Sequence, residues 1–412
     1  MKQLFMHGDG EMLQTAMLQE GKLVEFSMER SEGSGLVGNV YKGRVVNVLP
    51  GMQAAFVDIG LGKNAFLYID DLLHPHLERQ PEVKPAIHEL VRPGQELVVQ
   101  VMKEPIGSKG ARVTTHYSLP GRWLVYMPEA DYIGVSKKVP SESERTRLRA
   151  AGEQLRVGEE GIIMRTAAAF ESLESLRSDV MQLRSLWEAV VQRSHAAKAP
   201  AQLHREAGLL RRVIRDTAAA DIDEVWIDDA SRYKEAAALV KEMTPLLESR
   251  LRLYDGRKGS KLFEAFGITK QVDHVFGSRI ELASGGYLIW DETEALTVID
   301  VNTGKYTGTS DLEDTVYRTN KEAAEEIARL LRLRDVGGII IIDFIDMEHE
   351  HNQDRIRLQL EELVKQDRTK CTVVGWTRLG LLEMTRKKAR ENVVRQLTER
   401  CTECGGSGRK RL

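Results

Sequence analysis

Two β-branched runs that each reach an aspartate constrain the fold of this chain most. Residues 294–302 read EALTVIDVN, and residues 338–346 read GIIIIDFID. Continuous Ile/Val runs are typical of strands that are buried on both faces. An aspartate where such a strand reaches the surface packs poorly but suits a hard cation. Asp300 and Asp343 therefore predict a Mg²⁺ site on neighbouring strands, although each residue could instead cap a strand or a turn.

The residues between these runs predict the connection of a parallel sheet. Thr303–Gly308 is a turn with glycines, a lysine and hydroxyls, which suits either a phosphate backbone or a plain loop. Residues 320–334 carry apolar side chains at helical spacing, and Gly337 and Gly338 end that pattern. Strand, loop, helix and strand in this order form a crossover unit, so we expect an α/β layer with acids at its rim.

A CxxC sequence near the C-terminus supplies half of a structural zinc site. Tetrahedral sites take four Cys or His ligands, yet Cys371 is the one further cysteine and no histidine follows it. A second copy of the chain would complete a four-sulfur site with Cys401 and Cys404, which predicts a homodimer that shares one Zn²⁺. A local disulfide, a redox pair or two idle thiols fit the same spacing.

The N-terminal third has the pattern of a small barrel. Strand-like stretches at residues 38–60, 64–70 and 91–103 are interrupted by Pro-Gly and by glycines. Short strands at such spacing favour an OB-type barrel, a fold that binds single strands by stacking bases on aromatic side chains. Further along, the sequence predicts a capping box at Ser141 and Glu144, a strand at 159–166 and a helix at 171–192. It then predicts a linker at 196–200, a strand at 223–228 and helices at 203–217 and 230–250.

Four motifs in fixed order resemble the catalytic core of the ribonuclease E/G family, closer to its ribonuclease G branch. They are Asp300-Val-Asn302-Thr-Gly, Asp343-Phe-Ile-Asp346-Met, Arg378-Leu-Gly-Leu-Leu-Glu383-Met-Thr-Arg386 and Cys401-x-x-Cys404-x-Gly-x-Gly. The similarity covers essentially the whole chain. It implies a Mg²⁺-dependent endoribonuclease that cleaves single-stranded, A/U-rich RNA, leaves a 3′ hydroxyl and a 5′ phosphate, and serves rRNA processing and mRNA decay.

The resemblance also implies an α/β multidomain fold. Residues 1–35 and 205–277 would form a split RNase-H-like scaffold, in which Asp223 and Asp228 are structural. An S1 (OB-type) barrel and a 5′-sensor region would be inserted into this scaffold, and a DNase-I-like catalytic subdomain and a zinc knuckle would follow. The ranges expected for these four parts are 36–118, 119–204, 278–396 and 397–412.

In the implied mechanism Asp300 and Asp343 hold Mg²⁺, which lowers the pKa of a bound water and stabilises charge on the scissile phosphate. Asn302 orients that water or the metal shell, and Asp346 supports the site.

Family members usually continue beyond the zinc knuckle with a further domain that forms larger oligomers. Because this sequence stops eight residues after Cys404, we expect a dimer and not a tetramer.

The resemblance places RNA contacts on Phe56, Phe66 and Lys109, near the cleavage site. A core position for a phenylalanine and a plain loop charge for Lys109 are the alternatives.

In the sensor region Arg165 and Thr166 match the pair that holds the 5′ monophosphate, above a floor formed by Gly121 and Val125. An arginine fork and a hydroxyl are convergent donors for a phosphate. From the residues alone Arg165 is a surface charge.

Composition is compatible with this interpretation. A net charge of −3 argues against general phosphate attraction, but residues 385–412 contain nine basic and three acidic residues, which form either a basic face or a solvated tail. With no apolar stretch of about 18 residues, no signal peptide and three cysteines, we expect the cytoplasm. A non-catalytic RNA-binding protein and a DNA or phosphoester hydrolase are the competing hypotheses.

Overall fold

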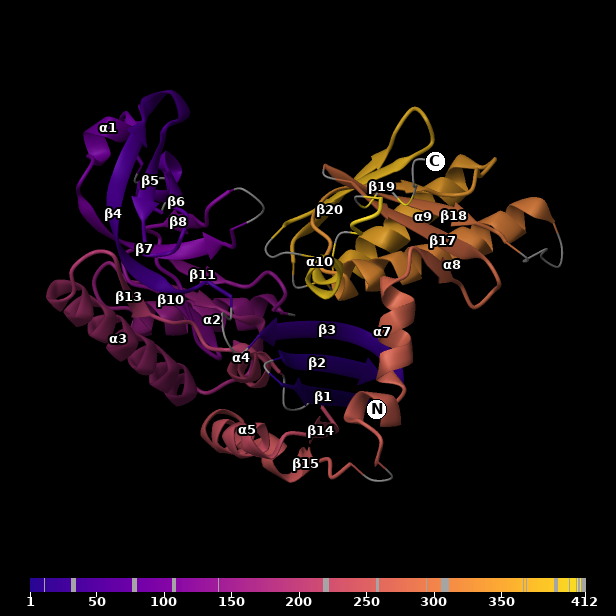
Figure 1. Ribbon diagram of the computed structural model, residues 1–412, viewed down its shortest axis with the longest axis horizontal. Coiled ribbons are helices and arrows are strands. Elements are labelled where there is room, and N and C mark those ends of the chain that lie inside the picture. Colours follow the sequence, from indigo (N-terminus) through magenta and orange to yellow (C-terminus); the bar gives the residue numbers. More distant parts are fainter. Residues whose placement is uncertain are drawn as a thin grey trace. The chain divides into compact units, whose positions relative to one another are not determined.

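Mixed α/β architecture characterises the protein, with four sheets among the residues that the structure describes (Figure 1). The computed structural model describes the whole chain except residues 11, 31–34, 76–79, 106–108, 140, 218–221, 257–258, 294, 305–310, 366, 368, 389–391, 400, 405, 407 and 409–412. The chain divides into two compact units. One contains residues 1–28, 222–233 and 250–412, and the other contains residues 29–221 and 234–249.

A closed five-stranded barrel forms part of the second unit. Its sheet has the order β13-β4-β5-β6-β8-β7, and pairing of β4 with β7 closes it. The strands are β4 (Val40–Leu49), β5 (Ala54–Asp58), β6 (Ala65–Tyr68), β7 (Glu96–Lys103), β8 (Arg112–Thr114) and the appended β13 (Ala201–His204), with the short helix α1 (Ile87–Leu90). Inward side chains such as Val57, Leu67 and Val99 fill the core. The predicted barrel is therefore confirmed and is consistent with an S1/OB-type domain.

The same unit also contains a smaller sheet of order β11-β12-β10-β9 and further helices. Its elements are β9 (Leu119–Pro120), β10 (Leu124–Met127), β11 (Ile133–Val135), β12 (Gly161–Met164), α2 (Glu142–Leu155), α3 (Leu173–Ala196) and α4 (Leu209–Asp216). The Ser141 hydroxyl accepts the Glu144 N–H at 3.1 Å, as a helix N-cap does. The Glu144 carboxylate instead accepts from Arg147 and from the Phe170 N–H, so only half of the predicted capping box forms.

The helix predicted at 203–217 is wrong in its first part. Residues Ala201–His204 are strand β13, which pairs with β4, and α4 begins only at Leu209. Leu203 is buried against Val40 and Val190, so tertiary packing decides its conformation. The predicted linker is also packed, because the Lys42 ammonium donates to the carbonyls of Ser194 and Ala197 at 2.9 Å.

The N-terminal sheet of the first unit joins distant parts of the chain. Its order is β15-β14-β1-β2-β3, with β1 (Lys2–Asp9), β2 (Met12–Gln19), β3 (Lys22–Arg30), β14 (Glu224–Ile227) and β15 (Leu251–Leu253). Helix α5 (Ala230–Met243) follows β14 in the chain, and its residues from 234 onward belong to the second unit. β1 and β14 pair in parallel. The Asp223 and Asp228 carboxylates accept the N–H groups of Lys2 and Gly8 at 2.6 and 2.9 Å, so both acids bind backbone beside this pairing.

The last sheet contains the predicted crossover unit. Its order is β16-β17-β18-β19-β21-β20. The strands are β16 (Arg279–Glu281), β17 (Tyr287–Glu292), β18 (Leu296–Asn302), β19 (Gly338–Asp343), β20 (Cys371–Trp376) and β21 (Leu382–Arg386), and the helices are α6 (Leu262–Ala265), α7 (Ile268–Phe276), α8 (Leu312–Leu333), α9 (Glu350–Val364) and α10 (Val393–Leu397). β18, α8 and the parallel strand β19 follow one another as expected. None of the described helices is long and apolar enough to cross a membrane.

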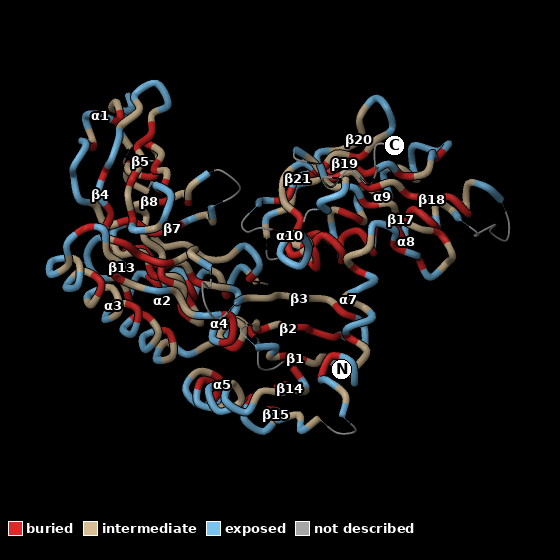
Figure 2. Tube along the Cα trace, viewed as in Figure 1, coloured by how far each residue is buried: buried red, intermediate tan, exposed pale blue. Residues whose placement is uncertain are grey.

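Burial of these central strands on both faces was predicted wrongly. Buried and half-buried residues alternate along β18, and Ile339 on β19 is 49% exposed. Ile299, Ile340 and Ile342 pack in one core with Ile327 of α8. Figure 2 colours the buried parts of the chain red and the exposed parts pale blue. The sheet is mixed, because β17 runs antiparallel to its neighbour β18, and β21 runs antiparallel to its neighbour β19. A sheet with antiparallel strands can keep one face open to solvent.

Arg386 does not belong to the basic face predicted for residues 385–412. This residue is 5% exposed, and its guanidinium donates to the Asp335 and Asp367 carboxylates at 2.7 and 2.9 Å. Much of the remaining stretch lies outside the described residues.

Candidate active site and RNA contacts

Asp300 and Asp343 lie directly opposite each other on neighbouring strands. β18 and β19 pair in parallel, and their register places Asp300 beside Asp343. Neighbouring strands lie about 4.8 Å apart, so the two carboxylates start from adjacent backbone positions. Asp343 is the last residue of β19, whereas Asp300 lies two residues before the end of β18 and faces away from the core that contains Ile299. The sequence thus predicted the pairing of the acids, with Asp300 slightly inside its strand.

The charges at this rim favour a cation. Burial and the nearby charges of Asp300 and Asp346 raise the pKa of Asp343 above its ordinary value. A divalent cation would relieve this repulsion between carboxylates, and oxygen ligands suit Mg²⁺. The Asn302 amide donates to Asp300 Oδ2 at 2.8 Å and fixes the orientation of that carboxylate. Among the described residues no group of three His, Cys, Asp or Glu side chains is arranged to hold a metal, so water or substrate oxygens would complete the shell.

Two further residues shape the rim: Asn320, which motif reasoning missed, and Gly304, the last residue of the Asp300-Val-Asn302-Thr-Gly motif. Asn320 on α8 is fully buried. Its amide donates to the Ile345 carbonyl at 2.8 Å, and its oxygen accepts the Ile345 N–H at 3.0 Å, which fixes the turn between Asp343 and Asp346. Gly304 has φ +56°, and an added Cβ would lie 2.5 Å from the Gly285 carbonyl oxygen. A buried asparagine within an apolar helix pattern was the available signal. The predicted phosphate turn from Lys305 onward lies outside the described residues.

On the barrel, Phe56 and Phe66 form an outward-facing aromatic pair. The two residues are in register on β5 and β6, with ring centroids 6.0 Å apart at an interplanar angle of 71°. Both are half-buried and lie outside the barrel core. Lys109 is exposed. The next residue is Gly110, and a Cβ there would lie 2.0 Å from the Asn64 carbonyl oxygen, so this close crossing brings the Lys109 backbone beside the start of β6.

The four residues matched to a 5′-phosphate pocket lie on or directly after the paired strands β9, β10 and β12 of the small sheet. The Arg165 guanidinium donates through Nη1 to the Gly121 carbonyl at 2.7 Å. Val125 lies on β10, which pairs with β12 just before Arg165. Thr166 is exposed and begins a short 3-10 turn, and its hydroxyl lies 2.9 Å from the Ser136 hydroxyl. The Arg165 side chain is 28% exposed, so the guanidinium is already held by protein groups and is not a free surface charge.

Two helix aspartates hold the backbone and the arginine of this group of residues, and no motif pointed to them. The Asp179 carboxylate on α3 accepts three consecutive backbone N–H groups, those of residues 122, 123 and 124, at 2.7–3.2 Å. A Cβ on Gly121 would lie 2.5 Å from both Asp179 oxygens, so a larger residue there would displace this carboxylate. Asp216 on α4 accepts a hydrogen bond from Arg165 Nη2 at 2.7 Å. These contacts span 50 or more residues, which local sequence patterns do not reveal.

The CxxC residues lie in a turn near the C-terminus. Thr402–Cys404 form this turn, in which Cys401 is exposed and Cys404 is half-buried. None of the three cysteines, all within the described part of the chain, forms a disulfide, so the local-disulfide alternative is wrong. Cys371 lies on β20, where burial raises the pKa of its thiol to about 11. Because the thiolate is the metal ligand, this residue is a poor one.

A closed barrel of the RNA-binding type, combined with an acidic pair on parallel strands, defines a class of nucleic-acid-processing enzyme. Residues 118–389 match the sequence profile of the Ribonuclease E/G family, and the chain belongs to this family, as the motifs predicted. It is 45% identical over 400 residues to Ribonuclease G of Escherichia coli strain K12, covering 95% of this chain and 81% of that protein.

Two more relatives support the same assignment. Ribonuclease G of Haemophilus influenzae is 44% identical over 401 residues, which cover 96% of this chain and 81% of the relative. Ribonuclease E of Nostoc sp. strain PCC 7120 is 38% identical over 395 residues, which cover 95% of this chain and 57% of the relative. The resemblance to the family is therefore confirmed.

Proposed function

We propose that this chain is a Mg²⁺-dependent endoribonuclease that cleaves single-stranded, A/U-rich RNA and prefers a 5′ monophosphate. The observation that carries the proposal is the in-register pair of Asp300 and Asp343 in a chain of the Ribonuclease E/G family. Its relatives are named Ribonuclease G and Ribonuclease E. We expect it to act in rRNA processing and mRNA decay in the cytoplasm.

Asp300 and Asp343 are the residues that would hold the ion. When bound, Mg²⁺ supplies an activated water and neutralises charge on the scissile phosphate. The chain's own residues set the geometry around it. Asn302 keeps the Asp300 carboxylate in place through the 2.8 Å hydrogen bond, and its amide oxygen remains available to orient the attacking water. Asp346 contributes negative charge beside Asp343 and would support the site without holding the ion.

The barrel would bind the single-stranded RNA. Phe56 and Phe66 present two adjacent rings outside the barrel core, and base stacking on aromatic rings tolerates many sequences. Lys109, exposed beside β6, would pair with a backbone phosphate. Duplex RNA keeps its bases stacked on each other, so this surface favours single strands.

The pocket formed by Gly121, Val125, Arg165 and Thr166 would read the 5′ end. The Arg165 guanidinium is held by the Gly121 carbonyl, and the exposed Thr166 hydroxyl follows it directly in the chain. A 5′ monophosphate has the charge and the several acceptor oxygens to use both donors, whereas a 5′ hydroxyl is uncharged and has a single acceptor oxygen.

Cys401 and Cys404 would bind one Zn²⁺ together with the same two residues of a second chain, and this shared ion would hold a homodimer together. The raised pKa of Cys371 supports the two-chain arrangement, because it leaves Cys401 and Cys404 as the two candidate ligands of each chain.

A cleavage assay on 5′-monophosphorylated single-stranded RNA, with Mg²⁺ and with EDTA, tests the proposal. We expect fragments with 5′ phosphates in Mg²⁺ and none in EDTA. Binding without cleavage in Mg²⁺ would instead establish a non-catalytic RNA-binding protein. Equal cleavage of a matched single-stranded DNA would establish a general phosphodiester hydrolase.

A further inference from the structure

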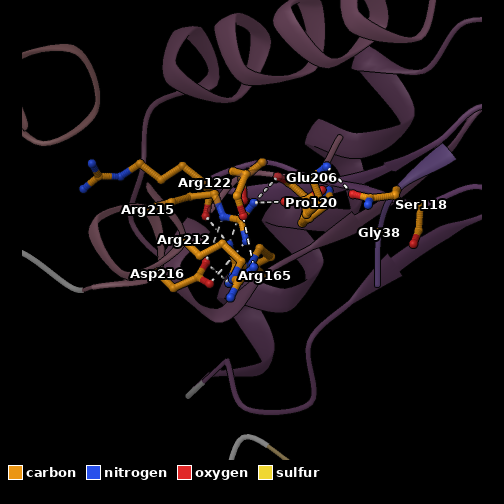
Figure 3. Close-up of polar contacts among 12 residues, drawn as sticks. Gly38, Ser118, Pro120, Arg122, Arg165, Glu206, Arg212, Arg215 and Asp216 are labelled. Atoms are coloured by element: carbon orange, nitrogen blue, oxygen red, sulfur yellow. Dashed lines mark hydrogen bonds and ion pairs between the residues drawn. The ribbon is translucent and has the colours of Figure 1, made fainter. Parts of the chain in front are cut away.

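The Arg165 guanidinium is held from two sides. On one side, Nη1 donates to the carbonyls of Gly121 and Arg122 at 2.7 and 3.3 Å. On the other side, Nη2 donates to Asp216 Oδ1 at 2.7 Å (Figure 3). Arginine side chains otherwise sample many rotamers, and a fork that is fixed in advance loses less entropy when a phosphate binds.

Asp216 is itself fixed by its neighbour on α4. Arg215 donates to both oxygens of the Asp216 carboxylate, at 3.2 and 3.3 Å. Burial opposes ionisation of Asp216, but hydrogen bonds and charge from Arg215, together with the charge of Arg165, hold its pKa below the ordinary value. The group is therefore a permanent carboxylate at neutral pH.

Arg215 continues this network to the barrel. Its Nη1 donates to the Pro120 carbonyl at 3.0 Å and to the Glu206 carboxylate at 3.1 Å, and the side chains of Arg215 and Glu206 are only 10% and 11% exposed. The Glu206 N–H donates to Asn39 Oδ1 at 2.8 Å, directly before strand β4. A buried chain of charges thus runs from the pocket arginine to the first barrel strand.

We infer that Asp216 is a positioning residue that aligns Arg165 for the 5′ phosphate, and that Arg215 and Glu206 anchor this alignment to the barrel. The inference rests on the proposed 5′-end preference. Arg165 and Arg215 are balanced by Asp216 and Glu206, so the cluster carries no excess positive charge. Selectivity for a monophosphate then depends on how the donors are aligned, and general attraction to phosphate contributes little.

Substitution of Asp216 separates alignment from charge. Asp216→Asn keeps the shape of the side chain and makes the cluster more positive by one charge. If Asp216 merely masked Arg165, this variant would bind the 5′ phosphate better. If Asp216 aligns Arg165, the variant reads the 5′ end worse. The two roles therefore predict opposite changes.

The test compares kcat/KM for one RNA sequence with a 5′ monophosphate and with a 5′ hydroxyl. In Asp216→Asn we expect the ratio of the two values to fall roughly tenfold, the usual scale of a lost charge-assisted hydrogen bond, with the 5′-hydroxyl value unchanged. Partial unfolding lowers both values equally and leaves the ratio intact. Asp131→Asn is the matched control, because Asp131 pairs with Arg156 at 2.7 Å in the same unit. Its ratio should equal that of the wild type.

Each outcome decides between the hypotheses. An unchanged or increased ratio in Asp216→Asn, with a clear wild-type preference, overturns the positioning role alone. A wild-type ratio of one overturns the proposed 5′-end preference, and this inference with it. If Asp216→Asn does not fold, Asp216→Glu keeps the charge and displaces the carboxylate by one methylene. A ratio that stays at the wild-type value in that variant also overturns the inference.

Discussion

Removal of a single ring from the barrel surface should weaken RNA binding more than it weakens the fold. Phe56→Ala or Phe66→Ala removes one base-stacking platform, a loss of about 1–3 kcal/mol or roughly 5–150-fold in Kd if each ring meets a base. The stability cost follows from the structure. Neither ring lies in the barrel core, so the main loss is their edge-to-face contact at 6.0 Å, worth about 0.5–1.5 kcal/mol. A core phenylalanine would cost about 3–5 kcal/mol.

Anisotropy of a labelled U-rich single strand in EDTA measures the affinity, and urea unfolding measures the stability. Val57→Ala is the matched control on the same strand. Its side chain is fully buried, so the variant should lose ~2 kcal/mol of stability and little RNA affinity. Because the two rings touch, the double variant should lose less stability than the sum of the single losses. A phenylalanine variant that loses stability like a core residue, with its affinity intact, would refute the contact role.

Three further perturbations test the other parts of the proposal. Asp343→Asn, like Asp300→Asn, should abolish cleavage in a single-turnover assay while RNA affinity stays within about twofold, because the carboxylate acts on the transition state. Glu326→Gln should lower the free energy of unfolding by ~2 kcal/mol at pH 7, since the carboxylate accepts from Arg329 and Lys22 at 3.0 Å. Although burial opposes ionisation, these partners keep the pKa of Glu326 low. Its stabilising effect is thus present above the unfolded value of about 4.5 and disappears as pH falls through the folded value. Cys404→Ser should lose Zn²⁺ and the dimer together, from about one zinc per two chains in the wild type.

Each of these tests has a control and an outcome that contradicts it. Wild-type rates in Asp343→Asn would remove this residue from the active site. A stability loss in Glu326→Gln that does not diminish as the pH falls below 4.5 would show that packing, and not charge, is responsible, and exposed Glu325→Gln serves as the matched control. Zinc at one per chain, or a monomeric wild type in sedimentation, would contradict the shared knuckle.

Sequence patterns predicted the parts of the fold that depend on local order. The β18, α8 and β19 crossover and the barrel strands follow from periodicity and turn residues, which are properties of neighbouring positions. The predicted helix at 203–217 failed because Leu203 packs on Val40, a contact that no local pattern contains. Burial of the central strands on both faces failed for a similar reason, since the antiparallel neighbours of the sheet are set by its overall topology.

The residues of the candidate sites show the same difference between local patterns, which the sequence reveals, and long-range contacts, which it does not. Asp300 and Asp343 each lie at or near the end of a recognisable strand, so the sequence was sufficient to pair them. Asp179 and Asp216 lie on helices more than 50 residues from the groups that they hold, and each reads locally as an ordinary helix-surface acid. Long-range hydrogen bonds of this kind become visible only when the structure brings the helices to the small sheet.

The parallel pairing of β1 with β14 has a consequence for synthesis of the protein. Lys2 and Asp223, whose hydrogen bond flanks this pairing, are 221 positions apart in the chain. At the usual translation rate of about 5–20 residues per second, β1 must wait roughly 10–45 s for its partner strand to leave the ribosome. Until then β1, β2 and β3 form a sheet in which the edge of β1, later covered by β14, is unpaired, and such an edge is a site for association with other chains. The inserted residues 29–221 therefore have time to fold first, and the N-terminal strands of the nascent chain are the segment most in need of protection by a chaperone.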